Sequence, residues 1–240
     1  MKDNITNYKK HSSSLVPIPS VSEEESIKAA MATQLKKKEL SDLHLRIIIK
    51  QEANQGNYQK AIAILDKLIA RLPNSAIDYN NRGLMYLKIA DYDQAMTDFN
   101  KAIALSPSLD RAYNNRGNCY AHQGNLSKAI ENYEKALDIN PYNQKVWINQ
   151  GITLRELGDY PLAIETLELA KMIGNQYLGR IYAERGYTRY LMGDWNYAIS
   201  DYRRALSYLP EGHRYQQKVM KWLAKVLKPV ISQSNLESDH

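Results

Sequence analysis

Part of the sequence repeats itself with a fixed period of 34 residues. Residues 76–109 and 110–143 carry the same or a similar residue at seven positions, each 34 positions after its counterpart. A period of this length is typical of a solenoid, in which each repeat buries its apolar face against its neighbours. The paired residues are Tyr79 and Tyr113, Gly83 and Gly117, Tyr86 and Tyr120, Ala95 and Ala129, Phe99 and Tyr133, Ala102 and Ala136, and Pro107 and Pro141.

Extending this period outward predicts five consecutive repeats. The first is degenerate in its first half, where Leu45, Ile49 and Glu52 replace the aromatic residue, Gly and Tyr of the clearest repeats. The fourth is one residue longer than the others and has Asn175 where proline is expected. We number the repeats 1 to 5; they span residues 42–75, 76–109, 110–143, 144–178 and 179–212.

Each repeat is expected to form two helices, because apolar residues recur twice at helical spacing. A turn such as Gly124-Asn125 in repeat 3, or Ala90-Asp91 in repeat 2, separates the two sets. Glycine permits the left-handed conformation that ends a helix, and Asn or Asp can cap the helix that follows. Four of the predicted second helices end at a proline, namely Pro73, Pro107, Pro141 and Pro210.

The ends of the chain differ from the repeats. Residues 1–21 are polar and contain two prolines, so we expect a disordered arm. Ser22 followed by Glu25 is a capping-box signal and predicts a leading helix over residues 22–41. Residues 213–228 have an apolar side beside a basic stripe, which predicts a helix that caps the last repeat. We expect residues 229–240 to form a flexible tail.

The pattern of aromatic, Gly, Tyr, Ala, Phe or Tyr, Ala and Pro resembles the tetratricopeptide repeat, or TPR, over residues 42–212. This resemblance implies an all-α fold, a right-handed superhelical solenoid of five helix-turn-helix repeats. The leading helix would precede it and the capping helix would close it. The first helix of each repeat would then line a concave groove.

One position departs from the family in a coordinated way. Arginine or glutamine stands before the Gly in four repeats, where the family often has Leu. A polar partner follows sixteen residues later in these repeats, whereas repeat 1 has isoleucine at both places. We therefore expect contact between the two helices of each repeat. The pairs are Ile48 and Ile64, Arg82 and Asp98, Arg116 and Asn132, Gln150 and Thr166, and Arg185 and Asp201.

No motif for catalysis or metal binding is present in the sequence. The five histidines lack ligand spacing, and Cys119 lies in a predicted first helix without a basic partner. We therefore predict no enzyme activity, no cofactor and no metal site.

The single cysteine excludes an intramolecular disulfide, and no apolar run is long enough to span a bilayer. We expect a cytoplasmic, monomeric protein without a membrane-spanning helix.

The resemblance implies that chosen positions of each first helix face the groove. The sixth position carries Asn81, Asn115 and Asn149, whose amides can bracket the backbone of a bound peptide. Basic residues stand around them and favour an acidic or carboxylate-bearing peptide. The candidate groove residues are Arg46, Lys50, Asn81, Arg111, Asn115, Asn118, Lys145, Asn149 and Arg180.

These features favour a protein–protein interaction module, acting as an adaptor, scaffold or assembly factor. One alternative is a peripheral membrane factor that assembles a photosynthetic or secretion complex, held by the basic final helix. Another is RNA binding by alternating aromatic and cationic residues. The net charge of +6 argues against a uniform nucleic-acid surface, because its excess lies at the chain ends and not along the repeats. The aromatic and cationic residues behind the RNA-binding alternative are Tyr177, Arg180, Tyr182, Arg185, Tyr187, Arg189 and Tyr190.

Overall fold

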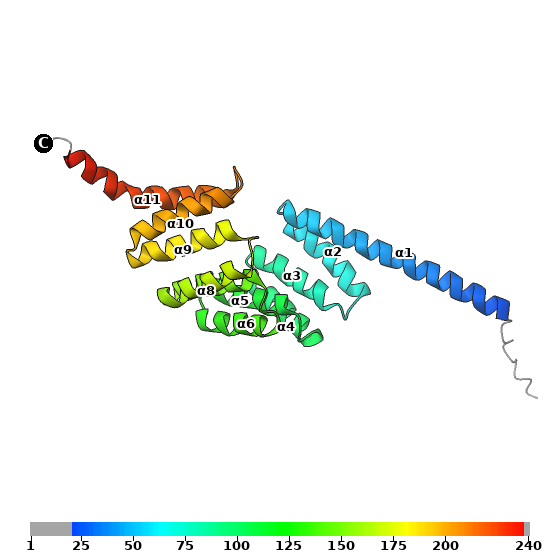
Figure 1. Cartoon of the computed structure of the whole chain (residues 1–240). Helices are drawn as coiled ribbons and strands as arrows, with labels where there is room; N and C mark the ends of the chain where they lie inside the picture. The colour runs from blue at the N-terminus through cyan, green and yellow to red at the C-terminus, as the bar shows by residue number, and fades with distance from the viewer. Residues whose placement is uncertain (1–20, 238–240) are drawn as a thin grey trace, which may run out of the picture. The chain divides into compact units, whose positions relative to one another are not determined.

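The structure, a computed structural model, describes residues 21–237 and is entirely helical over that range apart from the turns. It divides into two parts, residues 1–47 and residues 48–240, each considered by itself below. The helices are labelled in Figure 1. They are α1 (Val21–Asn54), α2 (Tyr58–Arg71), α3 (Ala76–Lys88), α4 (Tyr92–Leu105), α5 (Asp110–His122), α6 (Leu126–Ile139), α7 (Gln144–Glu156), α8 (Tyr160–Ile173), α9 (Leu178–Met192), α10 (Trp195–Tyr208) and α11 (Arg214–Glu237).

The first part is helical from Val21 onward, and α1 continues without a break to Asn54. The sequence predicted a separate leading helix over 22–41, so the predicted break was wrong. No Gly or Pro lies between Val21 and Asn54, and nothing in the backbone stops the helix before Gly56. The predicted disordered arm lies outside the described residues, apart from Val21.

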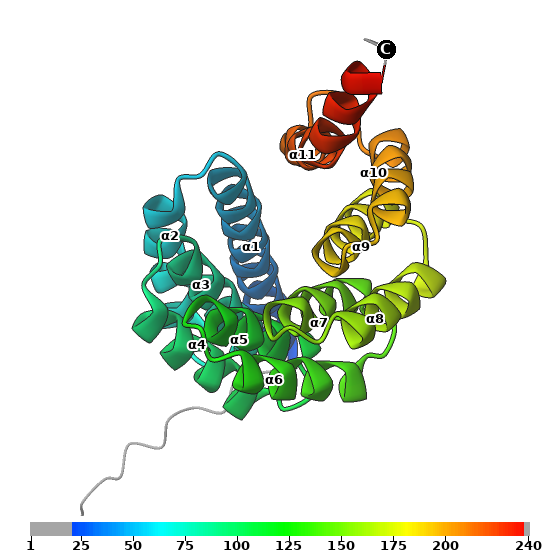
Figure 2. The ribbon, with the colours of Figure 1, turned by 90° about the vertical axis from the view of Figure 1, so that its left-hand side faces the viewer.

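Residues 48–240 form the solenoid. Figures 1 and 2 show α3/α4, α5/α6, α7/α8 and α9/α10 as antiparallel pairs that stack side by side. Each second helix packs against the first helix of the next repeat, so α2 contacts α3 and α4 contacts α5. The prediction of an all-helical repeat solenoid is confirmed.

A buried ring explains the repeated glycine in each first helix. Phe99 and Tyr133, at the same position of α4 and α6, are almost fully buried. A Cβ atom added to Gly83 would lie 2.8 Å from Cε1 of Phe99, and one added to Gly117 would lie 2.7 Å from Cε1 of Tyr133. Only glycine therefore lets the two helices of a repeat approach this closely.

The predicted helix-to-helix pairs are confirmed for three repeats. The Arg82 guanidinium donates from Nε and Nη2 to the two carboxylate oxygens of Asp98, at 2.8 and 2.7 Å. These hydrogen bonds raise the pKa of Arg82 above its ordinary value. Arg116 donates to Asn132 at 2.7 Å, and Arg185 pairs with the carboxylate of Asp201.

The same arginines also reach back to the preceding repeat, which the sequence did not predict. Arg82 Nη1 donates to Asp66 of α2 at 2.7 Å, and Arg116 Nη1 donates to Asn100 of α4 at 2.8 Å. Arg185 of α9 makes the equivalent ion pair with Glu168 of α8. Each of the three guanidinium groups therefore links one first helix to two second helices.

The turn inside repeat 2 contains the one non-glycine residue with positive φ among the described residues. Ala90 has φ of +60°, whereas glycine occupies the same position of the other four repeats. In repeat 3 this glycine is Gly124, with φ of +76° and nothing within 4 Å of an added Cβ atom. The left-handed conformation disfavours a Cβ by about 1–2 kcal/mol, so Ala90 is a strained position.

We predict that Ala90→Gly raises the free energy of unfolding by about 1 kcal/mol, because glycine adopts this conformation without strain. Gly124→Ala should lower it by a similar amount, and the open space around Gly124 means that only the backbone contributes. Urea denaturation of the two variants and the parent protein measures both effects. Destabilisation by Ala90→Gly would contradict the account.

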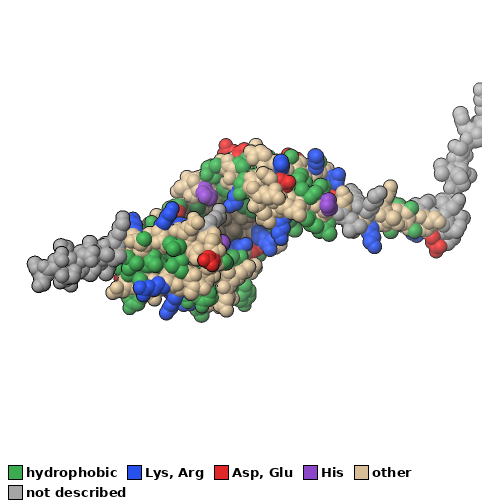
Figure 3. Space-filling model, turned by 90° about the horizontal axis from the view of Figure 1, so that it is seen from above, with side chains coloured by type: hydrophobic (Ala, Val, Ile, Leu, Met, Phe, Trp, Pro, Cys, Tyr) green, Lys and Arg blue, Asp and Glu red, His purple; other side chains and the backbone are tan. Residues whose placement is uncertain are grey.

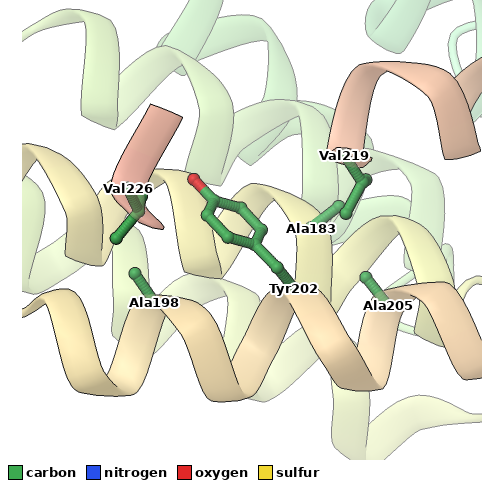
Figure 4. Packing of buried hydrophobic residues seen from close by; sticks show 6 residues of the cluster. All are labelled: Ala183, Ala198, Tyr202, Ala205, Val219 and Val226. Atoms are coloured by element: carbon green, nitrogen blue, oxygen red, sulfur yellow. The ribbon is translucent and has the colours of Figure 1, made fainter. Parts of the chain in front are cut away.

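The apolar side of α11 packs on α9 and α10 of the last repeat. Figure 4 shows Val219 and Val226 of α11 on either side of the buried Tyr202 ring of α10. The helix continues to Glu237, beyond the end predicted at residue 228, so helical backbone replaces most of the predicted flexible tail. The last three residues of that tail lie outside the described residues.

The Tyr202 hydroxyl is buried and has no hydrogen-bond partner among the described residues. Burial raises the pKa of this hydroxyl above its ordinary value. Tyr133, at the same position of repeat 3, instead donates its hydroxyl to Asn118 at 2.9 Å. Repeat 2 has Phe99 there, so the position accepts a ring without a hydroxyl.

We expect Tyr202→Phe to leave the free energy of unfolding unchanged or to raise it by about 1 kcal/mol, because it removes an unpaired buried polar atom. Tyr133→Phe is the matched control and should lower the free energy by about 0.5–1.5 kcal/mol, because it removes a hydrogen bond. Chemical denaturation compares the two. Equal losses in both variants would show that the Tyr202 hydroxyl has a partner.

Candidate functional site

A cavity of about 980 Å³ lies along the first helices of repeats 2 to 4. We call it the amide cavity, because asparagine and glutamine side chains make up much of its wall. Figure 3 shows Lys and Arg side chains beside a hollow in the surface. Five of the nine predicted groove residues line this cavity, namely Lys50, Asn81, Arg111, Asn115 and Lys145.

The amide cavity carries an excess of positive charge. Lys50, Arg111 and Lys145 line it and are exposed to solvent. Lys145 also lies over the ring of Tyr177, with Nζ 5.5 Å from the ring centre. Asp110 is the acidic lining residue, and its carboxylate accepts hydrogen bonds from the amides of Asn140 and Asn143, at 3.1 and 2.8 Å. These bonds hold the carboxylate in place, and the three cations outnumber its single negative charge.

A continuous chain of side-chain hydrogen bonds runs along the first helices. Arg180 of α9 donates to Asn149 of α7 at 3.1 Å, and Asn149 donates to Asn114 of α5 at 3.1 Å. Asn114 donates to its neighbour Asn115 at 3.4 Å. Asn115 then donates to Asn80 of α3 at 2.9 Å. The chain therefore joins the first helices of four repeats through polar groups.

The predicted asparagines differ in what they offer a ligand. Asn115 has a relative exposure of 9% and already uses its amide within the hydrogen-bond chain. Asn81 and Asn149 are half-buried, but only Asn81 lines the amide cavity. Asn115 therefore lines the cavity but has its amide engaged by Asn80 of the preceding repeat.

Four predicted groove residues do not line the amide cavity. Arg46 lies in the part of the chain that ends at residue 47. Asn118 and Asn149 line a smaller cavity of about 180 Å³, together with His122 and Glu156. Arg180 is half-buried in the hydrogen-bond chain, and burial lowers the pKa of its guanidinium group.

The sixth position of repeat 5 carries Glu184, whose side chain is buried. Its carboxylate accepts a charged hydrogen bond from Arg155 of α7 at 2.6 Å and a second bond from the hydroxyl of Tyr215 of α11. This residue therefore ties α7 and α11 to α9 and does not offer a free carboxylate.

Several residues of the amide cavity were not among the predicted groove residues. Asn80 and Asn114 precede the predicted asparagines of repeats 2 and 3 and line the cavity beside them. The repeated Asn-Asn pair was the signal that could have identified them. Tyr142 and Tyr177 lie in connections between repeats, where the helical pattern gives no information about side-chain position.

The residues behind the RNA-binding alternative are engaged within the fold. Arg185 and Arg189 both pair with the carboxylate of Asp201. Tyr187 stacks on Trp222 of α11, with ring centres 4.5 Å apart. These two arginines and this tyrosine therefore already use the groups with which they would contact bases.

The apolar side of α11, on which the membrane alternative depends, is already buried against the last repeat. Its packing residues are Val219, Trp222, Leu223 and Val226. No helix in the described part of the chain is both long enough and apolar enough to cross a bilayer.

The described residues contain no group of three or more His, Cys, Asp or Glu side chains placed to hold a metal ion. Cys119 is buried, and its thiol donates to the carbonyl oxygen of Tyr92 at 3.8 Å. Burial raises the pKa of the Cys119 thiol to about 11, so thiolate is scarce at neutral pH. The thiol acts as a small packing group in the core between α4 and α5.

Solved structures of other proteins share this fold. MamA is 21% identical with a TM-score of 0.56, and the match covers 67% of this chain and 94% of MamA. TTC0263, a thermophilic TPR protein from Thermus thermophilus, is 17% identical with a TM-score of 0.67, over 78% of this chain and 98% of that one. YrrB, described as a TPR protein with an unusual peptide-binding site, is 16% identical with a TM-score of 0.53, over 72% and 88%.

Comparison with curated proteins finds no match. Three tetratricopeptide repeat models match the sequence, one over residues 76–109 and 110–143, one over 132–165 and one over 45–75. Together they cover residues 45–165, which include most of repeat 1, repeats 2 and 3, and part of repeat 4. The chain belongs to the tetratricopeptide repeat family.

Proposed function

We propose that this protein is a non-enzymatic interaction module that binds an extended, acidic or carboxylate-bearing segment of another protein in the amide cavity. The observation that carries this proposal is the charge around the cavity. Lys50, Arg111 and Lys145 surround it, while the carboxylate of Asp110 is held by two amides. An anionic ligand would therefore meet three cations against one carboxylate, which two amides hold in place.

The two kinds of wall residue would have different roles. The exposed cations would attract an acidic segment and speed its association, with a strength that falls as salt is added. Asn81, which is half-buried and lines the cavity, would hold the backbone of the segment, because an amide both donates and accepts hydrogen bonds. Asn115 would act indirectly, because its hydrogen bond to Asn80 keeps the wall in position.

The family supports a protein as the ligand, and YrrB provides a structural neighbour described as having a peptide-binding site. An adaptor, scaffold or assembly factor in the cytoplasm, monomeric when free, is the role that we propose for such a module. Each of these roles requires only that the repeats present a fixed groove to a flexible segment, without chemistry at the site.

The test begins with a phage-displayed library of random peptides, selected on the full chain. Enriched peptides should contain acidic residues. A labelled synthetic copy should bind the Arg111→Glu/Lys145→Glu variant about 10-fold or more weakly at low salt, because reversed charges repel the ligand. Fluorescence polarisation measures the affinity, and the difference should shrink at high salt.

The matched control is Lys101→Glu/Lys135→Glu, which makes the same charge change at exposed positions of second helices. It should bind the peptide almost as tightly as the parent protein. Enriched peptides without acidic residues, or equal losses in both double variants, would contradict the proposed site.

A further inference from the structure

A second cavity, of about 280 Å³, lies at the junction of repeats 3 and 4. We call it the apolar cavity, because its walls are aromatic and aliphatic side chains from the connection after α6, from α7 and from α8. The lining residues are Pro141, Tyr142, Trp147, Leu169, Met172 and Ile173.

Three of these residues break the repeat pattern of the chain itself. Leu169, exposed to 39%, stands where the other four repeats have a lysine or arginine. Met172, exposed to 79%, stands where they have alanine, aspartate or serine, and Tyr142, exposed to 80%, where they have polar residues. The residues equivalent to Leu169 are Lys67, Lys101, Lys135 and Arg204. Those equivalent to Met172 are Ala70, Ala104, Asp138 and Ser207. Those equivalent to Tyr142 are Asn74, Ser108, Gln176 and Glu211.

The fold therefore does not require large apolar side chains at these positions. An exposed apolar surface of this kind marks a binding site for another molecule. The indole N–H of Trp147 donates to the carbonyl oxygen of Pro141 at 2.8 Å, so it is used within the fold. What the cavity offers is apolar contact, and a bulky aliphatic or aromatic side chain is the group that fits it.

The apolar cavity adjoins the amide cavity. Tyr142 and Ile173 line both of them, so the two cavities share a wall. A peptide in the amide cavity would therefore have the apolar cavity beside it. An extended chain advances about 3.3 Å per residue, so neighbouring residues of one segment can occupy the two sites.

We propose that the segment bound in the amide cavity places a large apolar side chain in the apolar cavity. The partner segment then carries an acidic group and, a few residues away, a leucine, isoleucine, methionine or phenylalanine. This inference rests on the proposed function and adds to it a second element of specificity. Electrostatic attraction selects an acidic segment, and the apolar cavity selects among acidic segments.

The same peptide library provides the test. Peptides enriched on the full chain should combine acidic residues with a large apolar residue at a preferred spacing. The Leu169→Lys/Met172→Ala variant introduces residues that other repeats carry at these positions and so suits the fold. It should bind a labelled enriched peptide about 10- to 100-fold more weakly, through the loss of apolar burial.

Two controls keep the result interpretable. Met220→Ala changes an exposed methionine of α11 that lines neither cavity, and it should bind as the parent protein does. Replacing the apolar residue of the peptide by serine should weaken binding to the parent protein, yet change little with Leu169→Lys/Met172→Ala. The part of this control that uses the parent protein does not depend on the folding of any variant.

The outcomes separate this inference from the proposed function. If Leu169→Lys/Met172→Ala binds as the parent does while Arg111→Glu/Lys145→Glu does not, the inference is overturned and the proposed function stands. If both bind as the parent does, both proposals fall. If the parent protein is a dimer in analytical ultracentrifugation and Leu169→Lys/Met172→Ala is a monomer, the apolar cavity belongs to a self-interface and the inference is overturned.

Discussion

The arginine before the repeated glycine joins neighbouring repeats at three places, through Arg82, Arg116 and Arg185. In repeat 2, Arg82 binds Asp98 of its own second helix and Asp66 of the preceding one. A planar guanidinium group has five donors in a fixed arrangement, so it can bridge two helices at once. Asp98 is only 2% exposed, and removing the arginine would leave its buried charge without this partner. The Arg82 side chain therefore takes part both in the pairing of helices inside repeat 2 and in the stacking of repeat 2 on repeat 1.

The period of the sequence predicted the helices and the pairs inside each repeat, because both lie within one repeat and depend on local spacing. The links from Arg82 to Asp66 and from Arg116 to Asn100 were not predicted, since they depend on how one repeat stacks on the next. The continuous α1 was missed for a different reason: the repeat register placed a boundary where the backbone has no helix-breaking residue.

The candidate site was predicted in part for the same physical reason. Lys50, Asn81 and Arg111 were found from their positions in the first helices, which the repeat fixes. Asn115 was predicted to hold a bound peptide and does line the cavity, but its hydrogen bond to Asn80 crosses between repeats and could not be read from one repeat. The stacking of the repeats therefore engages Asn115 in a hydrogen bond within the fold. The cations Lys50, Arg111 and Lys145 stay exposed around the cavity.

The most direct test of this account is a pair of double-mutant cycles on repeat 2, read by urea denaturation. One cycle combines Arg82→Leu with Asp98→Leu, and the other combines Arg82→Leu with Asp66→Ala. We predict a coupling energy of about 0.5–3 kcal/mol for the buried pair. For the pair with Asp66, which is 51% exposed, we predict a smaller but measurable coupling of about 0.2–1 kcal/mol. Strict additivity in both cycles would show that the guanidinium group does not join the repeats.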